Sequence, residues 1–133
     1  MTPTFADTAF YAAIVSDRDQ LHERAKEAAT RFSGPIVTTE FVLLETANFC
    51  TEGERRSVFL RLVANLRNAP HVEIVPATSE YFQRGLDFFA ARPDKKWSLT
   101  DCISFVLMRE RGLKEALTSN HNFTQAGFVA LLA

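Results

Sequence analysis

Short apolar runs alternate along the chain with longer segments in which apolar residues recur at helical spacing. The short runs predict β-strands at residues 3–6, 36–39, 72–75, 115–118 and 128–132. The longer segments predict helices over residues 9–15, 17–32, 40–50, 53–68, 78–92 and 98–112. Because the segment 40–50 is nearly all apolar, we expect that helix to be buried.

This order of strands and helices indicates the fold class. Strands that alternate with helices favour an α/β protein with a mainly parallel sheet and helices on both of its faces. In such a sheet the functional crevice lies beyond the carboxyl ends of the strands. Side chains just after each strand are therefore the first candidates for chemistry.

Composition narrows the class of protein. A length of 133 residues predicts one domain over residues 1–133, and 47% hydrophobic with 23% charged residues is ordinary for a globular protein. The net charge of −1 gives no global basic field, so a nucleic-acid role needs a local patch or a metal that offsets acidic residues.

Cys50 and Cys102 stand in apolar runs and are expected as buried thiols. No signal-peptide pattern and no apolar run near 18 residues occur, so we expect a cytoplasmic protein without a membrane segment.

Three acidic residues stand at informative places. Asp7 follows the first strand, where it could simply cap a helix. Glu45 lies among apolar helical neighbours, where a carboxylate is rare unless it pairs with an arginine or binds a metal. Asp101 follows Ser98 by three residues, a spacing that also fits a capping box.

The segment after the fourth strand adds a polar cluster, Thr118 to Asn122, which taken alone could be a solvated turn. Taken together, the three acids and this cluster would meet at one edge of the sheet. Carboxylates gathered in one cleft repel each other, and a divalent cation relieves that repulsion. Oxygen ligands without His or Cys favour Mg²⁺ or Mn²⁺, which activate water and stabilise a phosphoryl oxyanion. No glycine-rich phosphate loop is present, so hydrolysis of a phosphodiester fits better than an NTPase.

At these motifs the chain resembles the PIN-domain family, and specifically the VapC-type toxins of toxin–antitoxin pairs. The resemblance covers nearly the whole chain and rests on the stretches "FADTAF", "TTEFVLLETANF", "PDKKWSLTDCISFVLM" and "EALTSNHNFTQAGF". It implies a three-layer α/β/α fold around a four- to five-stranded, mainly parallel sheet, and Mg²⁺- or Mn²⁺-dependent endoribonuclease activity on tRNA or rRNA. It also implies a small antitoxin as partner and a homodimer.

The resemblance also assigns residues. Asp7, Glu45 and Asp101 match the acidic metal-site positions of the family, and Thr8 and Thr118 match supporting hydroxyl positions. The departure is Asn120, where the family most often has Asp. An amide oxygen can still ligate a metal or orient water, but it adds no charge. Asn120 could be natural and tolerated, the mark of an impaired enzyme, or an introduced change.

Contacts with RNA are expected from Lys95 and Lys96, which precede the helix of Asp101, and from His121 beside Asn120. For each of them ordinary surface charge is the competing interpretation. Trp97 could stack on a base, although packing is favoured. The many phenylalanines exceed the needs of a small core, so a subset is expected at a dimer or antitoxin interface.

Two hypotheses follow. The first is a metal-dependent endoribonuclease, the toxin of a toxin–antitoxin pair, with Asp7, Glu45, Asp101 and Asn120 as catalytic residues. The second, motivated by Asn120, is a PIN-like module that binds RNA or an antitoxin without cleaving.

Overall fold

The structure, a computed structural model, describes residues 1–133 and contains one mixed series of strands and helices. In chain order these are β1 (Thr4–Ala6), α1 (Thr8–Val15), α2 (His22–Arg31), β2 (Ile36–Thr39), α3 (Glu40–Ala47), α4 (Gly53–Asn68), β3 (Val72–Val75), α5 (Ser79–Ala91), α6 (Leu99–Arg111), β4 (Glu115–Leu117), α7 (His121–Gln125) and β5 (Val129–Ala130).

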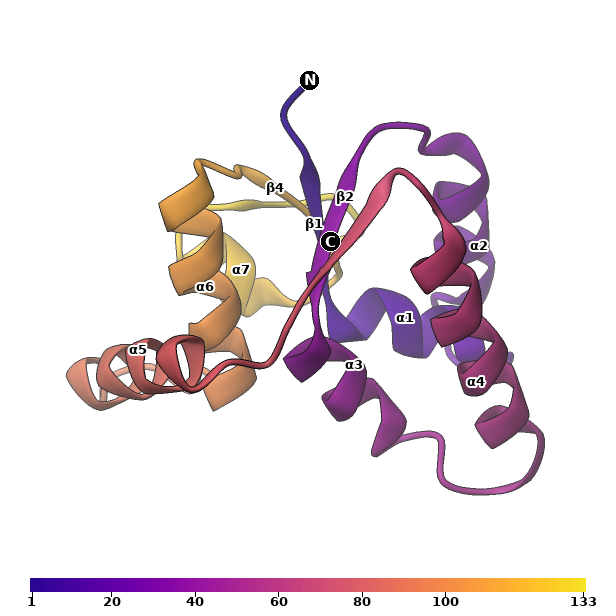
Figure 1. The fold of residues 1–133 in the computed structure, drawn as a ribbon, viewed down its shortest axis with the longest axis horizontal. Coiled ribbons are helices and arrows are strands. Elements are labelled where there is room, and N and C mark those ends of the chain that lie inside the picture. Colours follow the sequence, from indigo (N-terminus) through magenta and orange to yellow (C-terminus); the bar gives the residue numbers. More distant parts are fainter.

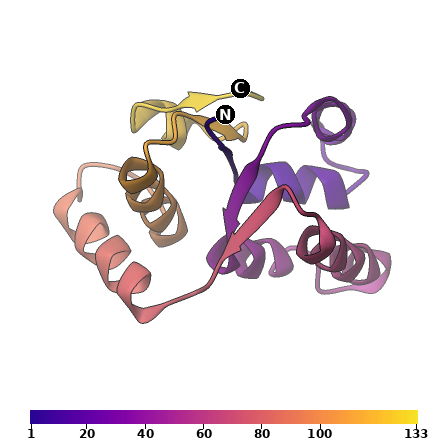
Figure 2. The same cartoon turned by 45° about the horizontal axis from the view of Figure 1, so that its top comes forward.

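The five strands form a single sheet in the order β3-β2-β1-β4-β5, and every neighbouring pair is parallel. Helices α1, α2 and α4 lie on one side of this sheet, and α5, α6 and α7 lie on the other (Figure 1). The turned view in Figure 2 shows the same separation, with the strands between the two groups of helices. The expected three-layer α/β/α architecture with a parallel sheet is confirmed.

The central strand β1 anchors the core. All three of its residues are buried, and it pairs with β2 on one side and β4 on the other. Beneath it, the ring of Phe105 from α6 packs edge-on against Phe123 of α7 and Trp97, with centroid distances of 4.9 and 5.1 Å. This aromatic cluster fixes the start of α6, which carries Asp101. Trp97 is only 4% exposed, so the prediction that it packs rather than stacks on a base agrees with the structure.

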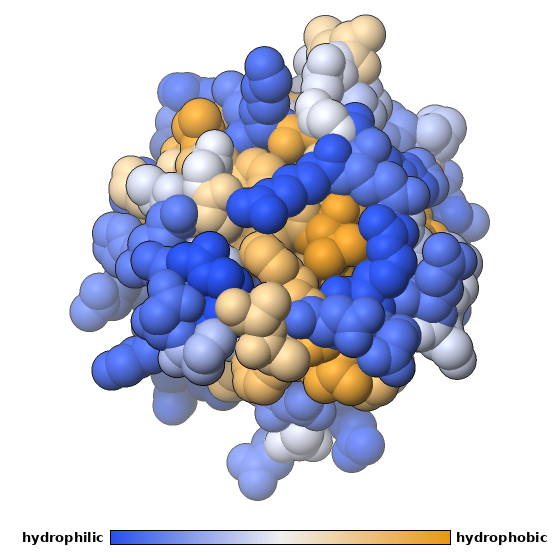
Figure 3. Space-filling view, turned by 90° about the vertical axis from the view of Figure 1, so that its left-hand side faces the viewer, coloured by the Kyte–Doolittle hydropathy of each residue, from blue (hydrophilic) through white to orange (hydrophobic).

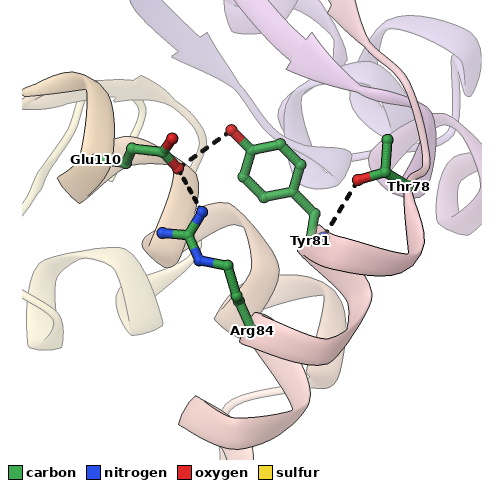
Figure 4. A network of polar contacts seen from close by, with 4 residues as sticks. All are labelled: Thr78, Tyr81, Arg84 and Glu110. Carbon is green, nitrogen blue, oxygen red and sulfur yellow. Dashed lines mark hydrogen bonds and ion pairs between the residues drawn. The ribbon is translucent and has the colours of Figure 1, made fainter.

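Helix α5 packs closely on α6 through Gly85. A Cβ atom at Gly85 would collide with Cγ1 of Ile103 and lie 3.1 Å from its Cα. A polar network holds the same two helices together: Glu110 accepts hydrogen bonds from Arg84 at 2.8 Å and from the Tyr81 hydroxyl at 3.2 Å, while Thr78 caps α5 (Figure 4). Helix α6 is therefore fixed from both its core face and its outer face.

Several sequence-based expectations differ from the structure. Helix α2 begins at His22 rather than residue 17, and α3 ends at Ala47. The helix over 40–50 was expected to be buried, which is wrong in part: Val42, Leu43 and Thr46 are buried, but Leu44 and Phe49 are exposed. The reason is that α3 covers only one end of the sheet and presents its other side to solvent. The short helix α7 was not predicted, because five residues are too few to show helical periodicity.

Cys50 and Cys102 are buried free thiols, as expected. None of the helices combines the length and the apolar character that crossing a membrane requires.

Candidate active site

A cleft of about 540 Å³ lies where β1, β2 and β4 end and the following helices begin. Asp7, Glu45, Asp101 and Asn120 all line it, although they come from four different segments of the chain. Asp7 directly follows β1, Glu45 lies in α3, Asp101 lies in the first turn of α6, and Asn120 precedes α7. The structure thus brings the four candidate catalytic residues into one cavity.

Asp7 is the most buried of these residues, with 2% of its surface exposed. Its Oδ2 accepts a 2.8 Å hydrogen bond from the Thr118 hydroxyl, whereas its Oδ1 is buried without any hydrogen-bond partner. Asp7 stands at the N-cap position of α1, but its side chain makes no capping hydrogen bond. Simple helix capping therefore does not explain this carboxylate.

The surroundings of Asp7 alter its ionisation. Burial, the largest effect, raises the pKa of the Asp7 carboxyl to about 7, and the negative charge of Asp101 adds to the rise. The hydrogen bond from Thr118 acts in the opposite direction. A nearby cation would stabilise the ionised form of this buried carboxyl group and could bind its unpaired oxygen.

Asp101 both caps a helix and faces the cleft. It forms a capping box with Ser98, whose hydroxyl accepts from the Asp101 amide at 3.0 Å while Asp101 Oδ2 accepts from the Ser98 amide at 3.1 Å. The amide groups of Asn122 and Asn120 donate to Oδ2 at 2.8 Å and to Oδ1 at 3.3 Å. The two interpretations of Asp101 are therefore compatible.

Asn120 uses both ends of its amide. Its Nδ2 donates to Asp101, and its Oδ1 caps α7 by accepting from the Asn122 amide at 2.9 Å. The backbone amide of Asn120 in turn donates to the Thr118 hydroxyl at 3.1 Å, so one chain of hydrogen bonds joins Asp7 to Asp101. An aspartate at this position could cap the helix, but its ionised side chain could not donate to Asp101.

Glu45 is partly buried and lines the cleft from α3. It takes part in none of the ion pairs of the chain, so the alternative that it is neutralised by a distant arginine does not hold. Thr8, the other expected supporting residue, also lines the cleft, and its buried hydroxyl has no hydrogen-bond partner.

Of the three residues expected to contact RNA, only one lines the cleft. Lys96 lines the cleft. Lys95 instead lies over the Trp97 ring, with Nζ 5.8 Å from its centroid, and His121 is exposed at the start of α7 without lining the cleft.

Several lining residues were not assigned to this cleft from the sequence, among them Asp19, Asn122 and Phe49. The signal of Asn122 in the sequence was its position two residues after Asn120, inside the same polar cluster. Phe49 lies just beyond α3, and the sequence analysis counted it among the phenylalanines divided between the core and an interface, not as part of this site.

The charges in the cleft suit a divalent cation. Four carboxylates, those of Asp7, Asp19, Glu45 and Asp101, line it against the two cations Arg55 and Lys96. No three Asp, Glu, His or Cys side chains in the chain are arranged to hold one metal ion together. Asp7, Glu45 and Asp101 are therefore not arranged as a ready three-carboxylate site, and a cation held there would bind through one or two of them with waters as further ligands, as Mg²⁺ commonly does. The unpaired Oδ1 of Asp7 is consistent with that kind of site.

Comparison with known proteins agrees with this architecture. The family profile described as "PIN domain" matches residues 4–129. The 23S rRNA-specific endonuclease VapC20 of Mycobacterium tuberculosis, from two strains, is 28% identical over 127 residues, which cover 94% of this chain and 95% of VapC20.

The crystal structure of the same VapC20, described as a sarcin-ricin loop cleaving toxin, superposes with a TM-score of 0.82 at 25% identity. That match covers 95% of this chain and 96% of VapC20. The profile match spans almost the whole chain, and sequence and structure lead to the same relative. The chain therefore belongs to the PIN-domain family and is of the VapC type.

Proposed function

We propose that this protein is a Mg²⁺- or Mn²⁺-dependent endoribonuclease that hydrolyses RNA phosphodiester bonds, and that it is the toxin of a toxin–antitoxin pair. The observation that carries the proposal is the buried Asp7 carboxylate, with one unpaired oxygen, in the same cleft as Asp101 of a VapC-type PIN fold. The relative VapC20 is named as an rRNA endonuclease, which supports RNA as the substrate class.

Asp7 and Asp101 would hold the cation, with Glu45 in support. A divalent cation bound there would offset the negative charges of these carboxylates and activate a water molecule. Thr118 fixes the orientation of the Asp7 carboxylate, and Asn120 with Asn122 fixes that of Asp101. Arg55 and Lys96 are the cations of the cleft and would bind substrate phosphates.

Ribosomal RNA is the first substrate to test and tRNA the second, because the relative is named for 23S rRNA. We further propose that residues 1–133 act as one domain in the cytoplasm.

A small antitoxin and a homodimer are the proposed partners. Helix α5 exposes Phe82, Leu86 and Phe89, which lie on one face because they are spaced four and three residues apart. Figure 3 shows apolar surface on this side of the molecule, enclosed by polar residues. An apolar patch with a polar rim is typical of a protein interface and supports the pairing of two copies there.

The purified protein, incubated with 23S rRNA in Mg²⁺, Mn²⁺ or EDTA, tests the function. We expect discrete internal cleavage in the presence of either metal, none in EDTA, and none with Asp7→Ala. Mapping the ends of the products separates internal cleavage from trimming. Cleavage that survives Asp7→Ala would overturn the assignment.

A second candidate is a PIN-like module that binds RNA or an antitoxin without cleaving. The amide of Asn120, which stands where a fourth carboxylate is usual and donates to Asp101, is what favours it. If the natural chain is inert and Asn120→Asp cleaves, the chain is a disabled nuclease. If neither cleaves, the binding module is the better description.

A further inference from the structure

Phe49 occupies an unusual position for an apolar side chain. It lies just after α3 and is 62% exposed. It lines the cleft that contains Asp7 and Asp101, and it also lines an adjoining hollow of about 440 Å³. Arg55 is the only other residue that lines both. Phe49 and Arg55 therefore form the boundary between the candidate active site and a second recess.

The second recess is otherwise polar. Besides Phe49, its lining consists of Asp17, Arg18, Thr51, Glu52, Glu54 and Arg55. A docked amphipathic helix needs several apolar contacts spaced along a groove, and this recess offers one. A single aromatic ring in polar surroundings suits a flat ligand that is aromatic on its face and polar at its edge.

A nucleobase is such a ligand. Every base has a π-face that stacks on an aromatic side chain and an edge with hydrogen-bonding groups. Three carboxylates in the recess outnumber its two arginines, so its charge favours the N–H groups of a base edge over a phosphate. Arg55 lies between this recess and the acidic cleft, where a phosphate attached to the stacked nucleotide would lie.

We propose that Phe49 is a base-stacking platform for an unpaired nucleotide next to the cleaved bond, with Arg55 binding the phosphate between them. This proposal rests on the proposed RNA-cleaving function and adds a specificity element to it: the nucleotide must be free of the duplex to stack. Structured RNA would therefore be cleaved in loops and bulges rather than within helices.

Cleavage kinetics give the first test. We expect Phe49→Ala to lower kcat/KM on a single-stranded RNA substrate by about five- to 150-fold, the range associated with loss of one stacked base. Phe49→Tyr should retain activity, whereas Phe49→Leu, which is apolar but not aromatic, should behave like Phe49→Ala. Leu44→Ala is the matched control, because Leu44 belongs to the same region, is 64% exposed and lines neither recess. Equal kcat/KM values for Phe49→Ala and Leu44→Ala would overturn the proposal.

Fluorescence gives a second test that does not depend on cleavage. In an Asp7→Asn background, Phe49→Trp places an exposed tryptophan at the platform, while the only natural tryptophan, Trp97, is 4% exposed and serves as the blank. Titration with a single-stranded RNA hexamer should quench the Phe49→Trp protein and leave Leu44→Trp unchanged, and a blunt duplex of the same sequence should quench much less. No quenching, or equal quenching of both variants, contradicts stacking.

Together, the two tests distinguish a failure of the stacking proposal from a failure of the proposed nuclease function. Quenching in a protein that never cleaves RNA would leave the stacking platform standing and overturn the nuclease. Cleavage that is indifferent to Phe49 would leave the nuclease standing and overturn the platform. If Phe49→Ala weakens binding of the antitoxin but not of RNA, the platform is a protein-docking residue and the proposal is wrong.

Discussion

The side-chain amide of Asn120 donates a hydrogen bond to Oδ1 of Asp101 at 3.3 Å, between the start of α7 and the first turn of α6. The position where the family resemblance led us to expect a further carboxylate thus holds a donor that stabilises Asp101. The cleft is assembled without added repulsion at this point, but it has less negative charge with which to attract a cation.

Asn120→Asp should exchange stability for metal affinity. In EDTA, the variant loses the amide donor and places two carboxylates side by side, so the free energy of unfolding should fall by about 1–3 kcal/mol. With Mn²⁺, the added charge should produce a larger rise in melting temperature than in the natural chain. Scanning calorimetry of both proteins in EDTA and in Mn²⁺ measures this, and identical responses would contradict the role given to Asn120.

Asp7 should make stability depend on pH in metal-free buffer. Its folded-state pKa of about 7 lies above the ordinary 3.8, so between these values the folded chain binds more protons than the unfolded chain. This contribution is fully present below pH 3.8, is lost as the pH rises, and levels off above 7. From pH 5 to pH 8 the loss should be roughly 3 kcal/mol. Denaturant unfolding in EDTA should show this loss, and Asp7→Asn should abolish most of it; an unchanged slope in the variant would assign the effect to another group.

Thr118→Val should raise the pKa of Asp7 further, because the hydroxyl that donates to the ionised carboxylate is removed. The titration midpoint of Asp7, followed by carbon NMR in EDTA, should move upward by about one to two pH units. Thr118→Ser keeps the hydroxyl and should titrate like the natural chain. A midpoint that stays in place in Thr118→Val would mean that this hydrogen bond does not stabilise the charge.

Gly85→Ala tests the packing that supports the site. Alanine is the better helix former by about 1 kcal/mol, yet its Cβ would collide with Ile103 and separate α5 from α6. We expect a net loss of about 1–3 kcal/mol in the free energy of unfolding, the usual result of overpacking. Ser79→Ala, at the exposed first turn of α5, is a control without this contact. Equal or greater stability in Gly85→Ala would show that the helices adjust freely.

The apolar pattern of the sequence predicted the bounds of some helices and strands and missed others. Strands β2 and β3 and helix α4 have the predicted bounds, because their apolar patterns end at clear breaks. Helix α7 depends on one capping side chain, Asn120, rather than on a repeating pattern, so periodicity could not reveal it.

In the candidate site, too, some features could be predicted from the sequence and others could not. The meeting of Asp7, Glu45 and Asn120 in one cleft could be anticipated, because each comes soon after the carboxyl end of a parallel strand. Asp101 follows helix α5 rather than a strand, so its place in the cleft was implied by the family resemblance. The raised pKa of Asp7 could not be anticipated, since it depends on complete burial and on which oxygen Thr118 contacts. The sequence left Phe49 open between the core and an interface, and its exposure beyond the end of α3 could be seen only in the structure.

The rate of RNA cleavage as a function of Mn²⁺ concentration, compared between the unmodified chain and Asp101→Asn, shows whether the Asp101 carboxylate holds the cation on which cleavage depends. Asparagine can still accept the hydrogen bond from the Ser98 amide, so the cap of α6 is kept while the charge and the acceptor for Asn120 are removed. We expect Asp101→Asn to cleave at least about a hundredfold more slowly, a loss typical of removing one charge-stabilising group, and to need a higher Mn²⁺ concentration at its midpoint. A rate and a midpoint equal to those of the unmodified chain would contradict this role of Asp101.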